Sequence, residues 1–446
     1  MPPISKQPES KSLQIAVKSK PTLLLILPGN EGRKPVLEAL VEFANIVVVL
    51  FVGGRDAEWV KPFVQGCIEV PQGSDNGVFN TSYEIVSNWF VNDESLPDGI
   101  MCYDEYGVEL SSYLCEKFCL PGTPFGTMRM FRNKLAFRNA CSEAGLCSIR
   151  YKHIKSEADI NDVLQDKDWP FPSVLKPRKG AGSWHVHKIE NRSDLLKIYH
   201  SLDENLRAGY FPVNIKDAGF LLEEYFEGAE VDIDGWATNG KVTFQLVSDN
   251  YPATEPYFLE QGGNYPSQLP LEAVNAFKDL TEKVLKLFSG VHSCFHFEAK
   301  MNLETMKLLP IEFNCRVGGA ECPLSVEAVT GYYLPVVAAR LALALPPPLP
   351  KRVAHKVVCS TNFYPDKAGV LTKNCHEVDA KKSKLVSLTL FQNRIGSNVQ
   401  ANNGSVSCLG WASSGGDSFE EASSNLEMVK KHIHVVVQPE DECKTE

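Results

Sequence analysis

The segment after the first twenty residues alternates a strand, a loop, a helix and a second strand, and this order constrains the fold more than any other feature. Residues 22–27 read TLLLIL and residues 46–51 read IVVVLF, with the loop PGNEG and a helical stretch through 40–43 between them. Two buried strands joined through a helix pair side by side in parallel. We therefore predict a parallel α/β sheet, to which residues 100–102 and 113–118 also contribute.

The glycines of that first loop do not match a known phosphate-binding motif. The loop reads PGNEGRK, which lacks both the Gly-x-Gly-x-x-Gly spacing of a dinucleotide site and the Gly-Lys-Ser/Thr ending of a P-loop. We interpret it as an ordinary turn between a strand and a helix.

Prolines and glycines divide the rest of the chain. Residues 1–20 contain four lysines and several serines without an apolar core, so we predict a disordered N-terminus rather than a secretory signal. The joint PGTPFGT separates a first α/β domain at 21–122 from a second domain of α+β texture at 123–345, which ends in LALALPPPLP. The remaining residues, 346–446, predict a smaller α+β lobe.

Composition excludes several classes of protein. The net charge of -10, from 55 acids and 45 bases, argues against a large nucleic-acid or anionic-membrane surface. Apolar runs are of strand length and stay far below the ~20 residues that span a membrane. Thirteen cysteines occur without a Cys-x-x-Cys pair, which favours reduced thiols. We therefore expect a cytoplasmic protein.

The first group with chemical potential surrounds Lys176. This lysine stands at the end of an apolar strand, immediately before a loop with Gly180 and Gly182. A cation on a rigid strand beside a backbone rich in N–H donors suits a triphosphate, because the lysine neutralises charge while the loop closes over the phosphates. The alternative is a solvated lysine before a hairpin turn, and the spacing alone does not decide between them.

A second group carries acids inside apolar strands. Glu298 and Glu312 flank a turn expected at 302–306, so a hairpin would bring both carboxylates onto neighbouring strands. Asn314 shares the face of Glu312, and these oxygens together suit Mg²⁺. Arg316 continues that face, where a guanidinium can grip a phosphoryl or carboxylate group. A hairpin whose polar face meets solvent is the alternative that this arrangement disfavours.

Four histidines lie near these groups: His185, His187, His292 and His296. His296 alternates with Glu298 along one strand, so we expect it at the same site. For the other three a structural or surface role is the simpler interpretation.

A third group lies in residues 221–235. Glu223 ends an apolar strand, Phe226 offers a flat apolar surface, and Glu230 lies beyond a glycine turn. In such a layout backbone groups can read an adenine edge and a carboxylate can hold ribose hydroxyls. Alone, this group is also compatible with solvated acids in a loop.

Together and in this order, the three groups resemble the ATP-grasp superfamily of carboxylate–amine ligases. The resemblance extends over residues 20–440, including a Rossmann-like α/β domain of the pre-ATP-grasp type and a C-terminal lobe like that of biotin-carboxylase-type members. The phrases FHFEAK and IEFNCRVGGAE are most similar to L-amino-acid ligases and to the ATP-grasp part of carnosine synthases. The resemblance implies an ATP-grasp fold of α/β and α+β class, with ATP between two lobes of residues 123–345.

The resemblance also implies a role for each motif residue. Lys134 and Lys176 match the two nucleotide lysines, and residues 179–183 match the mobile lid over the phosphates. Glu223 and Phe226 match the adenine-reading hinge, and Glu230 matches the ribose ligand. The implied nucleotide residues are thus Lys134, Lys176, Gly180, Gly182, Ser183, Glu223, Phe226 and Glu230. The implied magnesium ligands are Glu298, Glu312 and Asn314, and the implied catalytic residue is Arg316, in the closing signature with Gly318 and Gly319.

The sequence departs from the family pattern at two positions. Asn133 stands where many members have aspartate before the first lysine, and Cys315 stands where proline is common. Neither change removes an implied ligand, but both leave the subfamily open.

The implied activity is ATP-dependent ligation of a carboxylate to an amine. The carboxylate would be phosphorylated, and an amine would attack the acyl phosphate to give an amide, ADP and phosphate, joining an amino acid to another amino acid or a small amine. One alternative is a biotin-carboxylase-like or purine-pathway ligase, which would need a second basic cluster that we do not find. Another is a non-catalytic nucleotide-binding protein, which would be expected to have lost a ligand.

The resemblance also implies cofactors and partners. We expect ATP with Mg²⁺, for which Mn²⁺ is a substitute, together with small carboxylate and amine substrates. We expect neither nucleic acid nor membrane as a partner. A homodimer remains open.

Overall fold

The computed structural model of this chain describes residues 20–54, 57–92, 96–207, 219–391, 394–401 and 407–439. The disordered N-terminus predicted at 1–20 lies outside these residues, apart from Lys20. Among the helices of the described part, none is both long and apolar enough to cross a bilayer.

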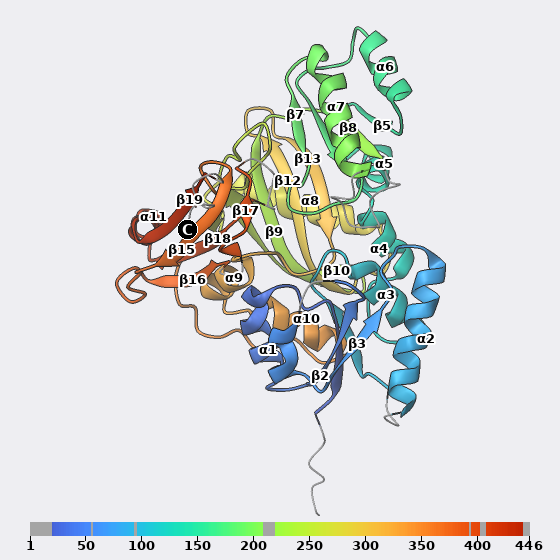
Figure 1. Ribbon diagram of the computed structural model, residues 1–446, viewed down its shortest axis with the longest axis vertical. Coiled ribbons are helices and arrows are strands. Elements are labelled where there is room, and N and C mark those ends of the chain that lie inside the picture. The colour runs from blue at the N-terminus through green and yellow to red at the C-terminus, as the bar shows by residue number, and fades with distance from the viewer. Residues whose placement is uncertain are drawn as a thin grey trace, which may run out of the picture.

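The first block is a parallel sheet, as the strand–helix–strand order predicts. Its strands run in the order β3-β2-β1-β4, and every pair is parallel. The strands are β1 (Thr22–Ile26), β2 (Asn45–Phe51), β3 (Gly66–Val70) and β4 (Gly99–Cys102). The helical elements are η1 (Glu31–Arg33), α1 (Lys34–Leu40), η2 (Glu58–Phe63), α2 (Asn76–Asn92) and α3 (Val108–Lys117). This block forms the blue base in Figure 1.

One predicted strand of this block is wrong. Residues 113–118, expected to continue the sheet, belong largely to α3. The first eight residues of the helix, from Val108 to Cys115, are all buried, including Glu109, Ser111 and Ser112, so solvent exposure does not set one of its faces apart. A helix buried on all sides lacks the periodicity that distinguishes it from a buried strand in the sequence.

The second block is a small antiparallel sheet with the order β5-β8-β6-β7. Two helices, α6 and α7, cover one face of it and bury Ile160, Leu195 and Tyr199 against its strands. The elements are α4 (Phe125–Phe131), α5 (Lys134–Glu143), β5 (Tyr151–Ile154), α6 (Glu157–Gln165), β6 (Ser173–Pro177), β7 (His187–Ile189), α7 (Arg192–Arg207) and β8 (Phe220–Glu224).

The third block is an eight-stranded sheet that crosses the predicted boundary at residue 345. Its order is β13-β12-β9-β10-β11-β14-β18-β16, so strands after that boundary extend the sheet of the middle region. Its strands are β9 (Ala229–Thr238), β10 (Lys241–Asn250), β11 (Gly263–Tyr265), β12 (Ser293–Asn302), β13 (Lys307–Asn314), β14 (Val357–Phe363), β16 (Leu385–Leu390) and β18 (Gly410–Gly416). The helices of this region are α8 (Leu271–Leu287), α9 (Cys322–Thr330), α10 (Leu334–Ala342) and α11 (Phe419–Lys431). A separate sheet contains β15 (Gly369–His376), β17 (Asn398–Val399) and β19 (Ile433–Gln438).

The two faces of β12 differ in chemistry, and this difference positions the site. Phe295, Phe297 and Ala299 are fully buried in a core shared with α8. The residues between them, His296 and Glu298, point to the opposite face. The aromatic side of the hairpin therefore anchors a polar side that faces the space between the second and third blocks.

The aromatic core under the hairpin gives a stability prediction. Phe313 is fully buried and its ring lies 4.8 Å from that of Phe131 and 5.2 Å from that of Phe295, between ring centroids. We expect Phe313→Ala to lower the free energy of unfolding by about 3–5 kcal/mol, because truncation leaves a cavity. Urea denaturation followed by circular dichroism measures it. Leu271→Ala, at a side chain that is 73% exposed, is the control and should change stability by less than ~0.5 kcal/mol. Equal stability of both variants would contradict this account of the core.

Candidate active site

A cavity of about 600 Å³ lies between the small antiparallel sheet and the eight-stranded sheet. Ten of the twelve residues implied by the sequence line it: Lys134, Lys176, Gly180, Gly182, Ser183, Glu223, Phe226, Glu230, Glu298 and Glu312. The other two, Asn314 and Arg316, do not line it but follow Glu312 along the chain. Residues from four separate parts of the sequence thus meet at one cavity.

The predicted hairpin forms with the expected pairing. Glu298 lies directly opposite Glu312 in the register of β12 and β13, and Asn314 donates from Nδ2 to Glu312 Oε1 at 3.0 Å. Burial, with the neighbouring carboxylates of Glu312 and Asp232, raises the pKa of Glu298 well above its usual value. Burial alone would also raise the pKa of Glu312, but Lys134 and Asn314 outweigh it and lower that pKa to about 2. The pair therefore combines a carboxylate whose charge Lys134 and Asn314 stabilise with one whose charge is disfavoured by burial and by neighbouring carboxylates.

The two predicted lysines are each paired with an acid. Lys134 forms an ion pair with Glu312, and Lys176 Nζ lies 2.6 Å from Glu223 Oε2. Asn133, the departure from the family pattern, caps α5 by accepting from the backbone N–H of Ala136. Lys134 thus stands at the N-terminus of a capped helix that directs it towards the cavity.

Arg138 is a buried member of this cluster that the sequence interpretation missed. Its Nε donates to Glu223 Oε1 at 2.6 Å, and its Nη1 donates to the carbonyl of Pro310 on β13. Burial would raise the pKa of Glu223, but Arg138 and Lys176 together lower it to about 2. Arg138 follows Lys134 by four residues, so the helical repeat places both on one face and could have revealed it.

The predicted lid, residues 179–183, lies in the loop between β6 and β7 at 178–186, and this loop contacts the first block. Lys179 Nζ lies 3.3 Å from both carboxylate oxygens of Glu109 on α3. Gly182 and Ser183 both adopt positive φ, of 60° and 53°, where a side chain costs backbone energy. The loop thus presents its backbone to the cavity in a tight turn.

The predicted hinge uses its side chains in two different ways. The carboxylate of Glu223 is already paired with Arg138 and Lys176. The backbone after β8 is therefore the group that can form hydrogen bonds with a nucleotide base. Glu230 accepts from Lys300, whose Nζ lies 3.1 Å from its Oε2. Phe226 lines the cavity beside them.

His296 lies at the site, as its alternation with Glu298 predicts, and two acids that the sequence interpretation missed hold it. In the register of β9 and β12 it faces Asp234, and its Nδ1 lies 3.0 Å from Asp234 Oδ1. Its Nε2 lies 3.8 Å from Asp232 Oδ2 and 3.7 Å from Glu298 Oε1. Burial would lower the pKa of His296, but these acids raise it to about 10. Asp232 and Asp234 alternate with apolar residues in VDID, a signal that the sequence offered.

Cys322 lies beside Asp234 and His296, but its sulfur is a thiol and not a thiolate. One ligand atom from each of Asp234, His296 and Cys322 lies within 4.8 Å of the others. Burial and Asp234 raise the pKa of the Cys322 thiol well above its usual value. A protonated thiol is a poor metal ligand, so we interpret the three side chains as a hydrogen-bonded group.

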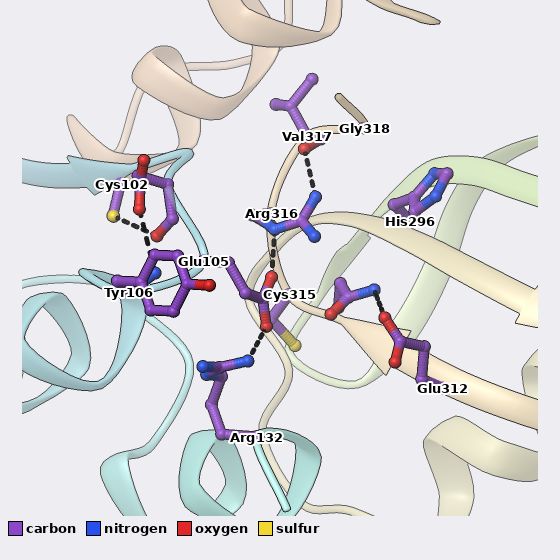
Figure 2. Close-up of polar contacts among 12 residues, drawn as sticks. Cys102, Glu105, Tyr106, Arg132, His296, Glu312, Cys315, Arg316, Val317 and Gly318 are labelled. Carbon is purple, nitrogen blue, oxygen red and sulfur yellow. Dashed lines mark hydrogen bonds and ion pairs between the residues drawn. The ribbon is translucent and has the colours of Figure 1, made fainter. Parts of the chain in front are cut away.

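Arg316 is held by an acid from the first block. Its Nε pairs with Glu105, which follows β4, and its Nη1 donates to the carbonyl of Val317 at 3.1 Å (Figure 2). Glu105 also pairs with Arg132. No local pattern marks Glu105, because it and Arg316 are 211 positions apart.

The fold is the ATP-grasp fold, and comparisons with known proteins agree with the resemblance seen in the sequence. The family described as the ATP-grasp domain matches residues 169–323, which include Lys176, Glu223, Glu298 and Glu312. The structure of L-amino acid ligase from Bacillus licheniformis superposes with a TM-score of 0.75 at 20% identity, covering 94% of this chain and 99% of that chain.

Two of the curated relatives are named as a synthase and a ligase. Carnosine synthase 1 of Gallus gallus is 30% identical over 268 residues, which are 58% of this chain and 29% of the relative. Alanine–anticapsin ligase of Bacillus subtilis is 25% identical over 162 residues, 36% of this chain and 33% of the relative. The matched segments therefore span about a third of the length of these relatives or less.

The Glu223 cluster predicts a stability that depends on pH. Because its folded pKa is lowered from 4.5 to about 2, Glu223 stabilises the fold above pH 4.5, and this contribution is lost as the pH falls towards 2. We expect Glu223→Gln to lower the free energy of unfolding by about 3 kcal/mol at pH 7, since two buried cations lose their partner. The deficit should shrink as the pH falls through that window. Urea denaturation at a series of pH values measures it.

The matched control for this variant is the next residue. Glu224 accepts from the backbone N–H of Arg150 at 3.0 Å, and we expect Glu224→Gln to cost about 1 kcal/mol or less. A deficit of Glu223→Gln that stayed constant from pH 7 to pH 2.5 would contradict the role assigned to its charge.

Proposed function

We propose that this chain is an ATP-dependent carboxylate–amine ligase that joins an amino acid to another amino acid or a small amine through an acyl phosphate, releasing ADP and phosphate. The observation that carries the proposal is the pairing of Glu298 with Glu312 at a cavity that Lys134 and Lys176 also line. Two oxygen ligands beside two cations suit the terminal phosphates of a nucleotide and the metal that accompanies them. The ligases among the relatives support the same reaction.

The residues present fit a magnesium ion. Glu298, Glu312 and Asn314 can bind a metal through oxygen atoms. A divalent cation would stabilise the charge of Glu298, which burial and neighbouring carboxylates disfavour. A bound Mg²⁺, or Mn²⁺ in its place, would supply charge stabilisation at the transferring phosphoryl group. These three residues are therefore the proposed metal ligands.

The remaining groups bind and orient the substrates. Lys134 and Lys176 are proposed to release their acids and neutralise phosphate charge, while the backbone of Gly180, Gly182 and Ser183 covers the phosphates and excludes water. The backbone after Glu223, with Phe226, is proposed to meet the adenine, and Glu230 the ribose. Arg316 is proposed to stabilise the negative charge that grows on the reacting carboxylate.

The proposal includes the domain boundaries, the class of substrates and the cellular compartment. Residues 21–122 would be the pre-ATP-grasp domain, 123–345 the ATP-grasp domain and 346–446 the C-terminal lobe. The substrates would be small carboxylates and amines in the cytoplasm, with neither nucleic acid nor membrane as a partner.

The test is a screen of pairs of amino acids, and of amino acids with small amines, for release of phosphate from MgATP. We expect ADP and phosphate in equal amounts, because the proposed ligands surround the terminal phosphates. Hydroxylamine in place of the amine should give a hydroxamate, which traps the acyl phosphate. Bicarbonate as the only productive acid would instead favour a biotin-carboxylase-like or purine-pathway ligase. Stoichiometric AMP and pyrophosphate would contradict the proposed mechanism.

Substitution of Glu312 tests its assignment as a metal ligand. We expect Glu312→Gln to retain the fold and to lose at least ~100-fold in kcat, because a neutral amide cannot balance a divalent cation at the reacting phosphate. Steady-state phosphate release at several magnesium concentrations measures this loss. Glu304→Gln, at an exposed position in the turn of the same hairpin, is the matched control and should keep wild-type kcat. An active Glu312→Gln variant with unchanged magnesium dependence would rule out the assignment.

A further inference from the structure

We propose that Glu105 is a positioning residue of this enzyme, which fixes the orientation of Arg316 and joins it, through Arg132, to the phosphate lid. The inference rests on the proposed function and adds a residue outside the ATP-grasp domain match at 169–323. One carboxylate of the first block lies between two guanidinium groups of the second and third blocks, as Figure 2 shows.

The position of Glu105 is rigid. It lies in the turn between β4 and α3 and is only 7% exposed. Asp104, the residue before it, accepts from the backbone N–H of Tyr106 through its side chain at 3.0 Å. Its carbonyl accepts from the backbone N–H of Gly107, also at 3.0 Å. Because the turn is closed on both sides of Glu105, its carboxylate has a fixed place from which to orient other groups.

Arg316 is thereby restricted to one orientation. Glu105 occupies its Nε and the carbonyl of Val317 occupies its Nη1. Its Nη2 makes no hydrogen bond to any residue that the structure describes. Two fixed contacts on a planar group define its plane, and both N–H donors of Nη2 remain for a substrate oxygen. Without Glu105, only the contact with the neighbouring carbonyl would hold this plane.

Arg132 connects the same carboxylate to the lid. Its Nη1 pairs with Glu105 and lies 3.5 Å from the carbonyl of Gly180 in the lid. Its Nε and Nη2 are buried and find no hydrogen-bond partner within the described ranges. A buried guanidinium with two unsatisfied donors depends on the partner it has. Glu105 therefore compensates Arg132 beneath the lid and Arg316 beside the hairpin at the same time.

Loss of Glu105 should therefore change kcat and KM for ATP to different extents. The ATP contacts proposed for Lys134, Lys176 and Glu230 do not involve Glu105, and its link to the lid is indirect, through Arg132 and the carbonyl of Gly180 at 3.5 Å. Loss of its charge should therefore disturb the step in which Arg316 acts more than the binding of nucleotide. A small misplacement of a reacting or stabilising group can cost ~100-fold in rate.

The experiment compares Glu105→Gln and Glu105→Asp with wild-type enzyme on a substrate pair found in the screen. We expect Glu105→Gln to lose about 10–100-fold in kcat while KM for ATP changes less than about threefold. Glu105→Asp keeps the charge and should recover part of the rate, and it covers the case in which the glutamine variant does not fold. Glu38→Gln, on the exposed surface of α1 in the same block, is the matched control and should keep wild-type kcat.

A double-mutant cycle separates positioning from a purely structural role. If Glu105 acts through Arg316, then Glu105→Gln should lower kcat much less in an Arg316→Lys background than in wild type. Equal fold-losses in both backgrounds would overturn the inference, as would a variant whose kcat is unchanged. A loss confined to thermal stability, with wild-type kcat in the folded protein, would also overturn it.

A second measurement does not need turnover, so it distinguishes this inference from the proposed function. Hydrogen exchange in Glu105→Gln should be faster than in wild type both at 178–186 and at 312–320, because both segments lose their shared anchor. The Glu38→Gln control should match wild type at both. Failure of every substrate in the screen would contradict the proposed function alone, whereas unchanged exchange at both segments would contradict the role of Glu105 alone.

Discussion

The compensation of buried charge is the physical constraint on which the site depends. Glu223, Glu312, Lys176, Arg132 and Arg138 are all at most 9% exposed, and each has a partner of opposite charge. An isolated buried charge is costly, so these side chains can remain only as a connected set. With Glu105 of the first block, the partner of Arg132, these charges come from all three blocks, and the position of each block therefore depends on the other two.

This dependence also means that the charged side chains of the cavity have partners that a charged ligand could replace. Lys134 holds Glu312, and Lys176 holds Glu223, in the positions where phosphate and metal are proposed to bind. A nucleotide with its metal carries both signs of charge, so it can take over the partners of lysine and glutamate together. The same side chains can then serve the empty and the occupied cavity without leaving a charge unpaired.

The sequence predicts the local parts of this arrangement better than the distant ones. The pairing of Glu298 with Glu312 follows from strand patterns around a short turn, and the cation at the end of β6 follows from an apolar run. The alternation of acidic and apolar residues in VDID also marks Asp232 and Asp234 as neighbours on one face of a strand. By contrast, Glu105 meets Arg316 only through the packing of two blocks, which no periodicity in either segment encodes. In α3 polar and apolar residues are buried alike, so the segment lacks the amphipathic pattern that distinguishes a helix from a strand.

The continuity of the large sheet has a consequence for how the chain can be divided. Strands β11 and β14 pair through Asn264 with Cys359 and Tyr265 with Val358, across the proline-rich connector. A fragment cut at that connector would retain every proposed nucleotide residue but would expose β11, three residues long, as a new sheet edge. Unpaired edges of this kind recruit other strands. The C-terminal lobe thus covers an edge of the large sheet, and a polypeptide that ended at the connector would leave the N–H and C=O groups of that edge without strand partners.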